Sequence, residues 1–166
     1  MSNIVKYNIN DFEKNITQNF KVKEFACKDD TPELYMDIDI VEKLQAIREY
    51  KNIPIKVICG YRTKSYNVRC DGAKNSKHLT GEAIDFAFLD NNIMNNKNIF
   101  YLANDINNNF RIKRIGIYIN REINFIHIDN GKEPLIWVND LKKQSYYNNV
   151  YDYLLDKQPI KVLSYE

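Results

Sequence analysis

Two stretches of the chain carry apolar residues at the three- and four-residue spacing of an amphipathic helix. Residues 37–50 begin with acidic side chains suited to a helix N-terminus and continue with a stripe formed by Ile40, Val41, Leu44 and Ile47. Residues 98–110 carry a second stripe, formed by Ile99, Leu102, Ala103, Ile106 and Phe110. The spacing predicts a helix over each stretch. Thr63 predicts a further, short helix through Arg69, because its hydroxyl can cap the first turn.

Several shorter stretches have the pattern of strands. Residues 54–59, 82–89, 114–119 and 124–129 are rich in β-branched and aromatic side chains and predict four strands. Residues 19–27 alternate apolar and charged side chains, which predicts a short extended segment. Helices and strands are mixed, and the last two strands are adjacent in the sequence. We therefore expect an α+β fold whose sheet is mainly antiparallel, has about four to five strands and is flanked by helices.

The two ends of the chain are less clearly patterned. Residues 1–19 predict a lead-in segment that contains a loosely attached helix around Phe12 and Ile16. Residues 134–166 predict an extension packed on the core, in which Trp137 fills the core and the tyrosine-rich residues 146–155 form a helix. No repeat, linker or charge block divides the chain, so we expect one domain over residues 1–166.

Composition narrows the class of protein. The 166 residues are 44% hydrophobic and 28% charged, a balance typical of one globular domain with its own core. Lys and Arg number 24 against 22 Asp and Glu, which is too even to predict a nucleic-acid partner. No apolar run approaches the length of a membrane span, and the first residues lack the apolar core of a signal peptide. We expect a monomer that binds neither nucleic acid nor membrane.

Three cysteines, Cys27, Cys59 and Cys70, are an odd number that does not suggest a disulfide framework. Three reduced thiols, or one bridge and one thiol, both fit this count. None of the cysteines has the short spacing to another Cys or His that is typical of zinc ligands. The spacing therefore argues against a cysteine-ligated metal.

The candidate chemistry gathers around the only two histidines of the chain, His78 and His127. Asp85 follows His78 inside an apolar strand, where an unpaired carboxylate would be costly. His127 and Asp129 are two residues apart and share one face of another predicted strand. Two imidazoles and a carboxylate that converge would form a zinc site with an open fourth position. Alternatively, each histidine is a core or surface residue whose nitrogens bond the backbone.

Four motifs around these residues resemble one known family. Residues 76–85 match its SxHxxGxAxD signature, residues 59–63 (CGYRT) resemble its SGYRS segment, and residues 125–131 (FIHIDNG) resemble its FVHVD element. Residues 25–29 (FACKD) are similar to the opening of a branch common in phage lysins and cell-wall hydrolases. Over about residues 20–130 the chain thus resembles the zinc D-alanyl-D-alanine carboxypeptidases and murein endopeptidases. This superfamily includes the vancomycin-resistance dipeptidases and shares its fold with the hedgehog signalling domain.

The resemblance implies a site residue by residue. His78, Asp85 and His127 would bind Zn²⁺, with water as the fourth ligand, and the metal would activate that water and polarise the scissile carbonyl. Arg62 would steady the substrate or the developing oxyanion, for which a permanently charged, forked guanidinium is well suited. Ser76 would either contact the substrate or shape the metal-binding loop.

The chain departs from the family pattern at the general base. The carboxypeptidase and dipeptidase branches carry an acidic residue three positions before the last zinc histidine, where this chain has Asn124. An amide cannot take a proton from water. Asp129 is the candidate base, or else a partner that orients a ligand. Glu122 is a weaker alternative.

These residues and the resemblance predict a zinc metallopeptidase that hydrolyses amide bonds in peptidoglycan stem or cross-bridge peptides. The alternative is a non-catalytic zinc module that binds the cell wall or belongs to a virion. The missing signal peptide and the lysin-like opening lead us to expect a phage or prophage endolysin, or a virion-associated enzyme. Such a protein stays in the cytoplasm until it is released to act on the wall.

Overall fold

The fold is given by a computed structural model, which describes residues 3–120, 122–140, 143–150, 152–153, 155 and 161–164. The chain forms two compact units, one made of Met1–Asn52 with Val57–Asp85 and the other of Ile53–Lys56 with Phe86–Glu166. The boundary between them runs through the strands β3 (Ile55–Cys59) and β4 (Ala83–Phe88). The sequence-based expectation of a single domain stays a prediction.

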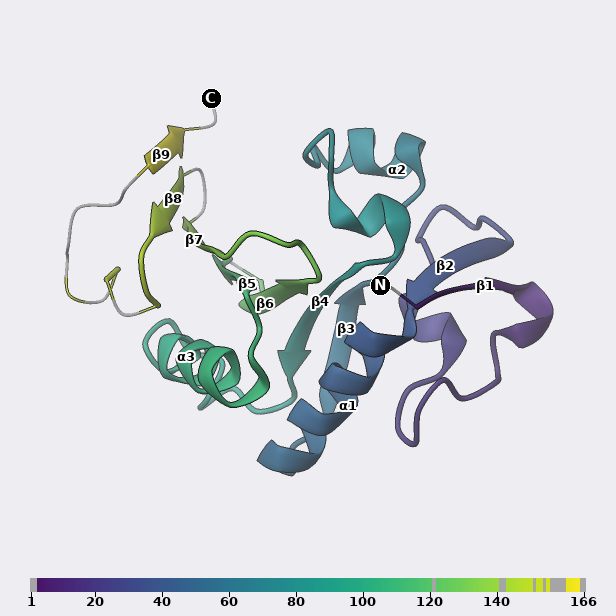
Figure 1. The fold of residues 1–166 in the computed structure, drawn as a ribbon, viewed down its shortest axis with the longest axis horizontal. Coiled ribbons are helices and arrows are strands. Elements are labelled where there is room, and N and C mark those ends of the chain that lie inside the picture. Colours follow the sequence, from purple (N-terminus) through teal and green to yellow (C-terminus); the bar gives the residue numbers. More distant parts are fainter. Residues whose placement is uncertain are drawn as a thin grey trace. The chain divides into compact units, whose positions relative to one another are not determined.

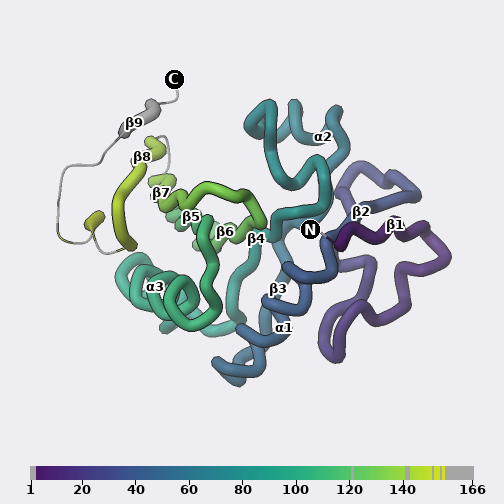
Figure 2. The backbone as a smooth tube through the Cα atoms, in the orientation of Figure 1, coloured from purple at the N-terminus to yellow at the C-terminus, as the bar shows by residue number. Residues whose placement is uncertain are grey.

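The first unit begins with a two-stranded antiparallel sheet. β1 (Ile4–Asn8) pairs with β2 (Glu33–Asp37), and the two strands run side by side in the tube view (Figure 2). The 3-10 helices η1 (Ile9–Asp11) and η2 (Val22–Phe25) lie between them in the sequence. The helix predicted around Phe12 and Ile16 is wrong, because these residues lie in a turn and a bend. Residues 4–8 alternate in exposure and gain a strand partner that lies far away in the sequence.

The extended segment predicted over residues 19–27 is also wrong, because η2 occupies its centre. Val22 and Phe25 are both buried, and their three-residue separation fits one face of a 3-10 helix. The backbone N–H of Lys21 donates to Glu24 Oε1 at 2.8 Å and closes the start of this helix. The apolar and charged pattern of this stretch therefore has the period of a tight helix.

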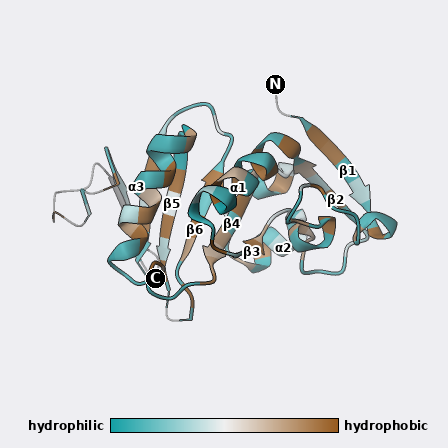
Figure 3. Ribbon diagram, turned by 90° about the horizontal axis from the view of Figure 1, so that it is seen from below, coloured by the Kyte–Doolittle hydropathy of each residue, from teal (hydrophilic) through white to brown (hydrophobic). Residues whose placement is uncertain are grey.

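The helix predicted over residues 37–50 is confirmed as α1 (Ile38–Lys51). Asp37 caps it, because its Oδ1 accepts a hydrogen bond from the N–H of Asp39 at 3.1 Å. Asn52 ends the helix in the left-handed conformation. Apolar and polar residues are interspersed along the helix in Figure 3, and the apolar ones supply Ile40, Val41, Leu44 and Ile47 to the core.

The short helix predicted after Thr63 is confirmed as α2 (Lys64–Arg69), with Thr63 as its N-cap. The 3-10 helix η3 (Lys77–Thr80) then leads into β4, whose six residues are all buried. Burial on both faces explains why the sequence of β4 reads as a nearly continuous apolar run around Asp85. The strand thus places one carboxylate in an apolar setting.

The larger sheet of the described residues has the strand order β3-β4-β6-β5-β7-β8-β9. The predicted helix over residues 98–110 is confirmed as α3 (Asn98–Phe110), and the last two predicted strands are confirmed as β5 (Arg114–Ile119) and β6 (Phe125–Asp129). α3 packs on both strands (Figure 1). β5 pairs with β6 antiparallel and with β7 (Leu135–Asp140) parallel. The antiparallel pairs β7–β8 and β8–β9 follow, where β8 is Lys143–Tyr147 and β9 is Lys161–Ser164.

The α+β class is confirmed, and the sheet is larger than expected: it has seven strands among the described residues, and β5 and β7 pair in parallel. The helix predicted over residues 146–155 is wrong in its described part, because Tyr146 and Tyr147 belong to β8. Residues 151 and 154 of that stretch, and 141–142, 156–160 and 165–166 of the predicted extension, lie outside the described residues. Trp137 is buried in β7, as expected. No described helix is long and apolar enough to cross a membrane.

Candidate metal centre

A tight loop before β4 presents His78. Ser76 caps η3, and its Oγ accepts a hydrogen bond from the backbone N–H of His78 at 3.3 Å. Gly81 ends η3 with a positive φ of 73°, and a Cβ at this position would lie 2.0 Å from the carbonyl oxygen of Tyr35. The Gly81 carbonyl also accepts from the N–H of Asp37 at 2.9 Å. Ser76 therefore shapes the loop, and its contact with substrate stays a prediction.

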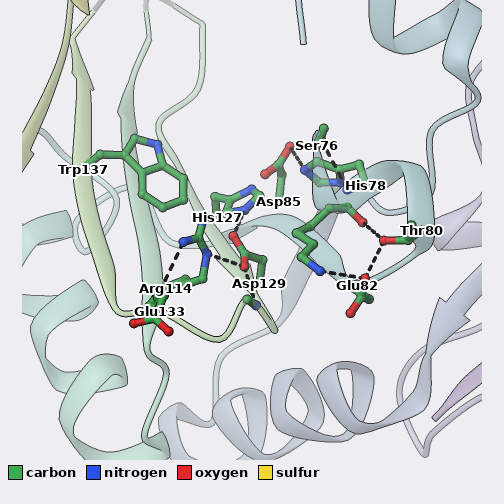
Figure 4. A network of polar contacts seen from close by, with 12 residues as sticks. Ser76, His78, Thr80, Glu82, Asp85, Arg114, His127, Asp129, Glu133 and Trp137 are labelled. Carbon is green, nitrogen blue, oxygen red and sulfur yellow. Dashed lines mark hydrogen bonds and ion pairs between the residues drawn. The ribbon is translucent and has the colours of Figure 1, made fainter. Parts of the chain in front are cut away.

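Both nitrogens of the His78 imidazole have a partner, and Figure 4 shows the one on the side of Asp85. Nδ1 lies 2.6 Å from the carbonyl oxygen of Gly60, so this nitrogen carries the proton and donates it. Nε2 faces Asp85 Oδ2 at 3.2 Å. A backbone carbonyl that fixes the ring in this way is the usual support for a metal-binding histidine, and it leaves Nε2 as the metal-binding nitrogen.

Asp85 is buried in the middle of β4 and is paired, as its apolar setting requires. Its Oδ2 accepts a hydrogen bond from Arg62 Nη2 at 2.9 Å and faces His78 Nε2. The prediction that this carboxylate has partners is confirmed. Asp85 and His78 thus form a buried pair of donor atoms of the kind that divalent metals bind.

Arg62 joins this pair to a third residue. Its Nη2 donates to Asp85, its Nε lies 3.0 Å from the sulfur of Cys59, and its backbone N–H donates to the carbonyl of His78 at 3.0 Å. Burial lowers the pKa of the guanidinium, but the charges of Cys59 and Asp85 outweigh this effect and the pKa is raised above its ordinary value. Arg62 is therefore a permanent cation beside the candidate metal ligands.

Cys59 is the site residue that the sequence reasoning missed. It ends β3, and its sulfur, an imidazole nitrogen of His78 and a carboxylate oxygen of Asp85 all lie within 4.8 Å of one another. Sequence reasoning missed Cys59 because no other Cys or His lies close to it in the sequence. The available sign was its place next to the Gly-Tyr-Arg segment that resembles the family motif. Thiolate, imidazole and carboxylate are the donor types that zinc uses, so this group fits the metal.

A second cluster is centred on His127 and Asp129 of β6, both buried. His127 Nε2 lies 3.1 Å from Asp129 Oδ2, and the ring lies 5.1 Å from that of Trp137 (Figure 4). Gly116 stands opposite both His127 and Trp137 in the sheet. A Cβ on Gly116 would lie 2.4 Å from the indole, so the glycine makes room for the tryptophan beside the histidine.

Asp129 is surrounded by donors. Its Oδ1 accepts from Arg114 Nε and from the N–H of Gly131, both at 2.7 Å, while Oδ2 faces His127. Burial raises the pKa of this carboxyl, but the hydrogen bonds of His127 and Gly131 and the charge of Arg114 outweigh it, so the pKa is lowered. Asp129 is therefore ionised, and it holds His127 by Nε2, which makes Nδ1 the nitrogen that would bind a metal.

Asn124, which replaces the usual acid of the family pattern, has a structural task. Its Nδ2 donates to the carbonyl of Met94 and to Asn96 Oδ1, both at 2.8 Å. Its Oδ1 accepts from the backbone N–H of Asn120 at 3.0 Å. The amide thus ties the β5–β6 turn to the segment before α3. Glu122, the weaker candidate for the base, is exposed in the same turn.

Comparison with known protein families decides the relationship. A model of the Peptidase M15 family matches residues 18–129, well over half of the chain. The chain belongs to the peptidase M15 family. This confirms the resemblance to the zinc D-alanyl-D-alanine carboxypeptidase superfamily. No curated protein matches the chain.

In this M15 peptidase the matched segment contains both clusters. Peptidases of the family depend on zinc, and the cluster of Cys59, His78 and Asp85 is a possible site for it. The structure brings His78, Asp85 and Arg62 together in the first unit. It brings His127 and Asp129 together in the second. That His78, Asp85 and His127 share one ion stays a prediction.

Proposed function

We propose that this M15 peptidase is a zinc enzyme that hydrolyses amide bonds in peptidoglycan stem or cross-bridge peptides. The observation that carries the proposal is the buried pair of His78 and Asp85, with His78 Nδ1 fixed on the Gly60 carbonyl and Nε2 turned to the carboxylate. Burying these groups is costly, and a metal ion gives them a reason to be there. The match to the family over this segment supports the same assignment.

The residues that would hold the ion are His78 through Nε2, Asp85 through Oδ2 and His127 through Nδ1. A zinc ion bound there would polarise the scissile carbonyl and activate a water molecule at neutral pH. Zinc ligands are themselves held by hydrogen bonds to carbonyls and carboxylates. Gly60 supplies such a bond to His78, and Asp129 supplies one to His127.

Arg62 would bind the substrate. Its guanidinium already donates through Nη2 to Asp85, and its side chain is 17% exposed. A planar, permanently charged group is suited to a carboxylate or to the oxygen of a carbonyl that gains negative charge. We assign to Arg62 the stabilisation of that oxygen or of a terminal carboxylate of the stem peptide.

Asp129 would act by positioning His127, because both oxygens of its carboxylate already have partners in the structure. The geometry supports this role over that of general base. A general base needs an oxygen that can approach the attacking water. Arg114 and Gly131 share Oδ1, and His127 faces Oδ2.

One observation favours a second candidate, a zinc module that binds the cell wall without cleaving it. Asn124 stands where the carboxypeptidase branch carries its base, and its amide is bonded within the turn. A chain without a proton acceptor could keep the metal and the binding surface and lose turnover.

The test is incubation of the zinc-loaded protein with a purified pentapeptide muropeptide and with a cross-linked muropeptide dimer, followed by mass spectrometry. Loss of one D-Ala shows a carboxypeptidase, and division of the dimer shows an endopeptidase. The variant His78→Ala should abolish either reaction, whereas Lys74→Ala, a change at an exposed position just before the metal-binding loop, should not. Full zinc content with both substrates intact would contradict the enzyme and support the wall-binding module.

We further propose that the protein acts as a monomer at the cell wall, where these peptides lie. Phage or prophage lysis is the route that the lysin-like motif at residues 25–29 suggests. Stem and cross-bridge peptides are its expected partners, and neither nucleic acid nor membrane is.

A further inference from the structure

The thiol of Cys59 lies in the same cluster as His78 and Asp85 and has no part in the function proposed above. One donor atom of each residue lies within 4.8 Å of the other two. We propose that Cys59 is an additional protein ligand of the metal ion that His78 and Asp85 bind, so that with His127 and the activated water the ion would be five-coordinate. The inference rests on the proposed function for the metal site itself and goes beyond it in the ligand set.

Backbone contacts of Gly60 and Arg62, which follow Cys59 in the chain, hold this segment beside the metal-binding loop. The Gly60 carbonyl accepts the proton of His78 Nδ1 at 2.6 Å, and the N–H of Arg62 donates to the His78 carbonyl at 3.0 Å. A Cβ on Gly60 would lie 2.7 Å from Phe25, so the chain passes too close to that residue for a side chain. The backbone next to Cys59 is therefore held near His78 by the same contacts that orient the imidazole.

The guanidinium of Arg62 holds the two acidic donors of the cluster together. Its Nε lies 3.0 Å from the sulfur of Cys59, and its Nη2 lies 2.9 Å from Asp85 Oδ2. Once Cys59 gives up its proton to a metal, its sulfur would repel the Asp85 carboxylate, and the positive charge of Arg62 beside both offsets that repulsion. Arg62 thereby holds both donors beside His78.

The distances are close to those of a metal site. Ligand atoms around a tetrahedral zinc ion lie about 3.3–3.6 Å apart, given zinc bonds of about 2.0–2.3 Å. His78 Nε2 and Asp85 Oδ2 already lie 3.2 Å apart. The sulfur lies within 4.8 Å, so a rotation of the Cys59 side chain that moves it by about 1 Å completes the set. A sulfur ligand also favours zinc or cobalt over magnesium or calcium.

The primary experiment uses the full chain with Co²⁺ in place of zinc. A thiolate ligand gives cobalt a charge-transfer band in the near ultraviolet, which a site of nitrogen and oxygen ligands lacks. We expect the band in the wild-type protein, its loss in Cys59→Ser, and its retention in the matched controls Cys27→Ser and Cys70→Ser. Cobalt bound without the band, or a band that persists in Cys59→Ser, would overturn the inference.

Zinc affinity, measured by competition with a chelator, gives a second readout. Cys59→Ser should weaken zinc binding at least tenfold, because even the loss of a group that only supports a ligand costs about 10–100-fold. Unchanged affinity would overturn the inference and leave the proposed peptidase standing. Failure of the wild-type protein to bind any metal would overturn both.

A third readout uses the wild-type protein alone and does not depend on the folding of a variant. Iodoacetamide should label Cys59 in the metal-free wild-type protein, because its side chain is partly exposed, and zinc should protect it. Cys70 is exposed and serves as the internal control, labelled with or without zinc. Equal labelling of Cys59 in both states, measured by peptide mass spectrometry, would overturn the inference.

Discussion

The change Asp129→Asn separates the two roles that a carboxylate beside His127 can have. In the wild-type protein Oδ1 accepts from Arg114 and Gly131, and Oδ2 faces His127 Nε2. An asparagine can keep Oδ1 as an acceptor for both donors. Its amide nitrogen then faces His127 Nε2 as a donor, which forces the imidazole proton onto Nδ1. That tautomer cannot bind a metal through Nδ1.

The structure gives the size of both effects. Loss of the group that fixes a ligand's tautomer should weaken zinc binding about 10–100-fold. The bond from the Gly131 N–H becomes a neutral one and loses about 1 kcal/mol, since hydrogen bonds to charged groups contribute about 1.5–3 and neutral ones about 0.5–1.5 kcal/mol. The bond from Arg114 keeps its charged donor, so we expect Asp129→Asn to lower the free energy of unfolding by about 1 kcal/mol.

Zinc affinity is measured by competition with a chelator, and stability by urea unfolding followed through the fluorescence of Trp137, the only tryptophan. Asp140→Asn is the matched control, because Asp140 accepts a hydrogen bond from the hydroxyl of Tyr153 at 2.7 Å and belongs to neither cluster. It should lower stability and leave zinc affinity unchanged. If Asp129→Asn binds zinc as tightly as the wild type and loses only turnover, Asp129 is the general base and our reasoning is refuted.

Three further outcomes follow from other contacts. Gly81→Ala should destabilise the protein by more than the about 1–2 kcal/mol of a left-handed residue, because its Cβ meets a backbone carbonyl, and urea unfolding checks this. Asn124→Asp should lower the free energy of unfolding by about 1–3 kcal/mol without raising turnover, since a carboxylate cannot donate the two hydrogen bonds of the amide. Faster hydrolysis at unchanged stability would contradict this. Glu13, paired with Lys23 and Lys21, should titrate with a pKa of about 2 when followed by NMR. Its contribution to the stability of the fold is therefore present above about pH 4.3 and lost as the pH falls through about 2. An ordinary pKa for Glu13 would contradict the pairing.

The parts of the fold that the sequence predicts well are those whose patterns are local. α1 and α3 each have an apolar stripe and a residue at one end that is typical of a helix terminus, all within a few turns of chain. β5 and β6 are short runs rich in β-branched residues. β1 was missed because it depends on pairing with β2, a partner distant in the sequence. Its residues alternate, but nothing near them indicates a second strand.

The site divides in the same way. The motif around His78 and Asp85 places two donors a few residues apart, and the pair forms as expected. Cys59 comes to the same place through the hydrogen bond between Gly60 and His78, which no spacing rule contains. Arg114 reaches Asp129 because the two residues stand opposite one another in the β5–β6 register. Register depends on the whole sheet, so the partner of Asp129 was not predictable from the sequence.

The most direct measurement of the central claim is the hydrolysis of a defined muropeptide before and after removal of the metal. The protein is treated with a chelator, assayed by mass spectrometry, and assayed again after one equivalent of Zn²⁺ is restored. We predict that cleavage stops without metal and returns with zinc, with water added across one peptide amide bond. Cleavage that continues at full rate in the metal-free protein would contradict the account, and so would stoichiometric zinc with no cleavage.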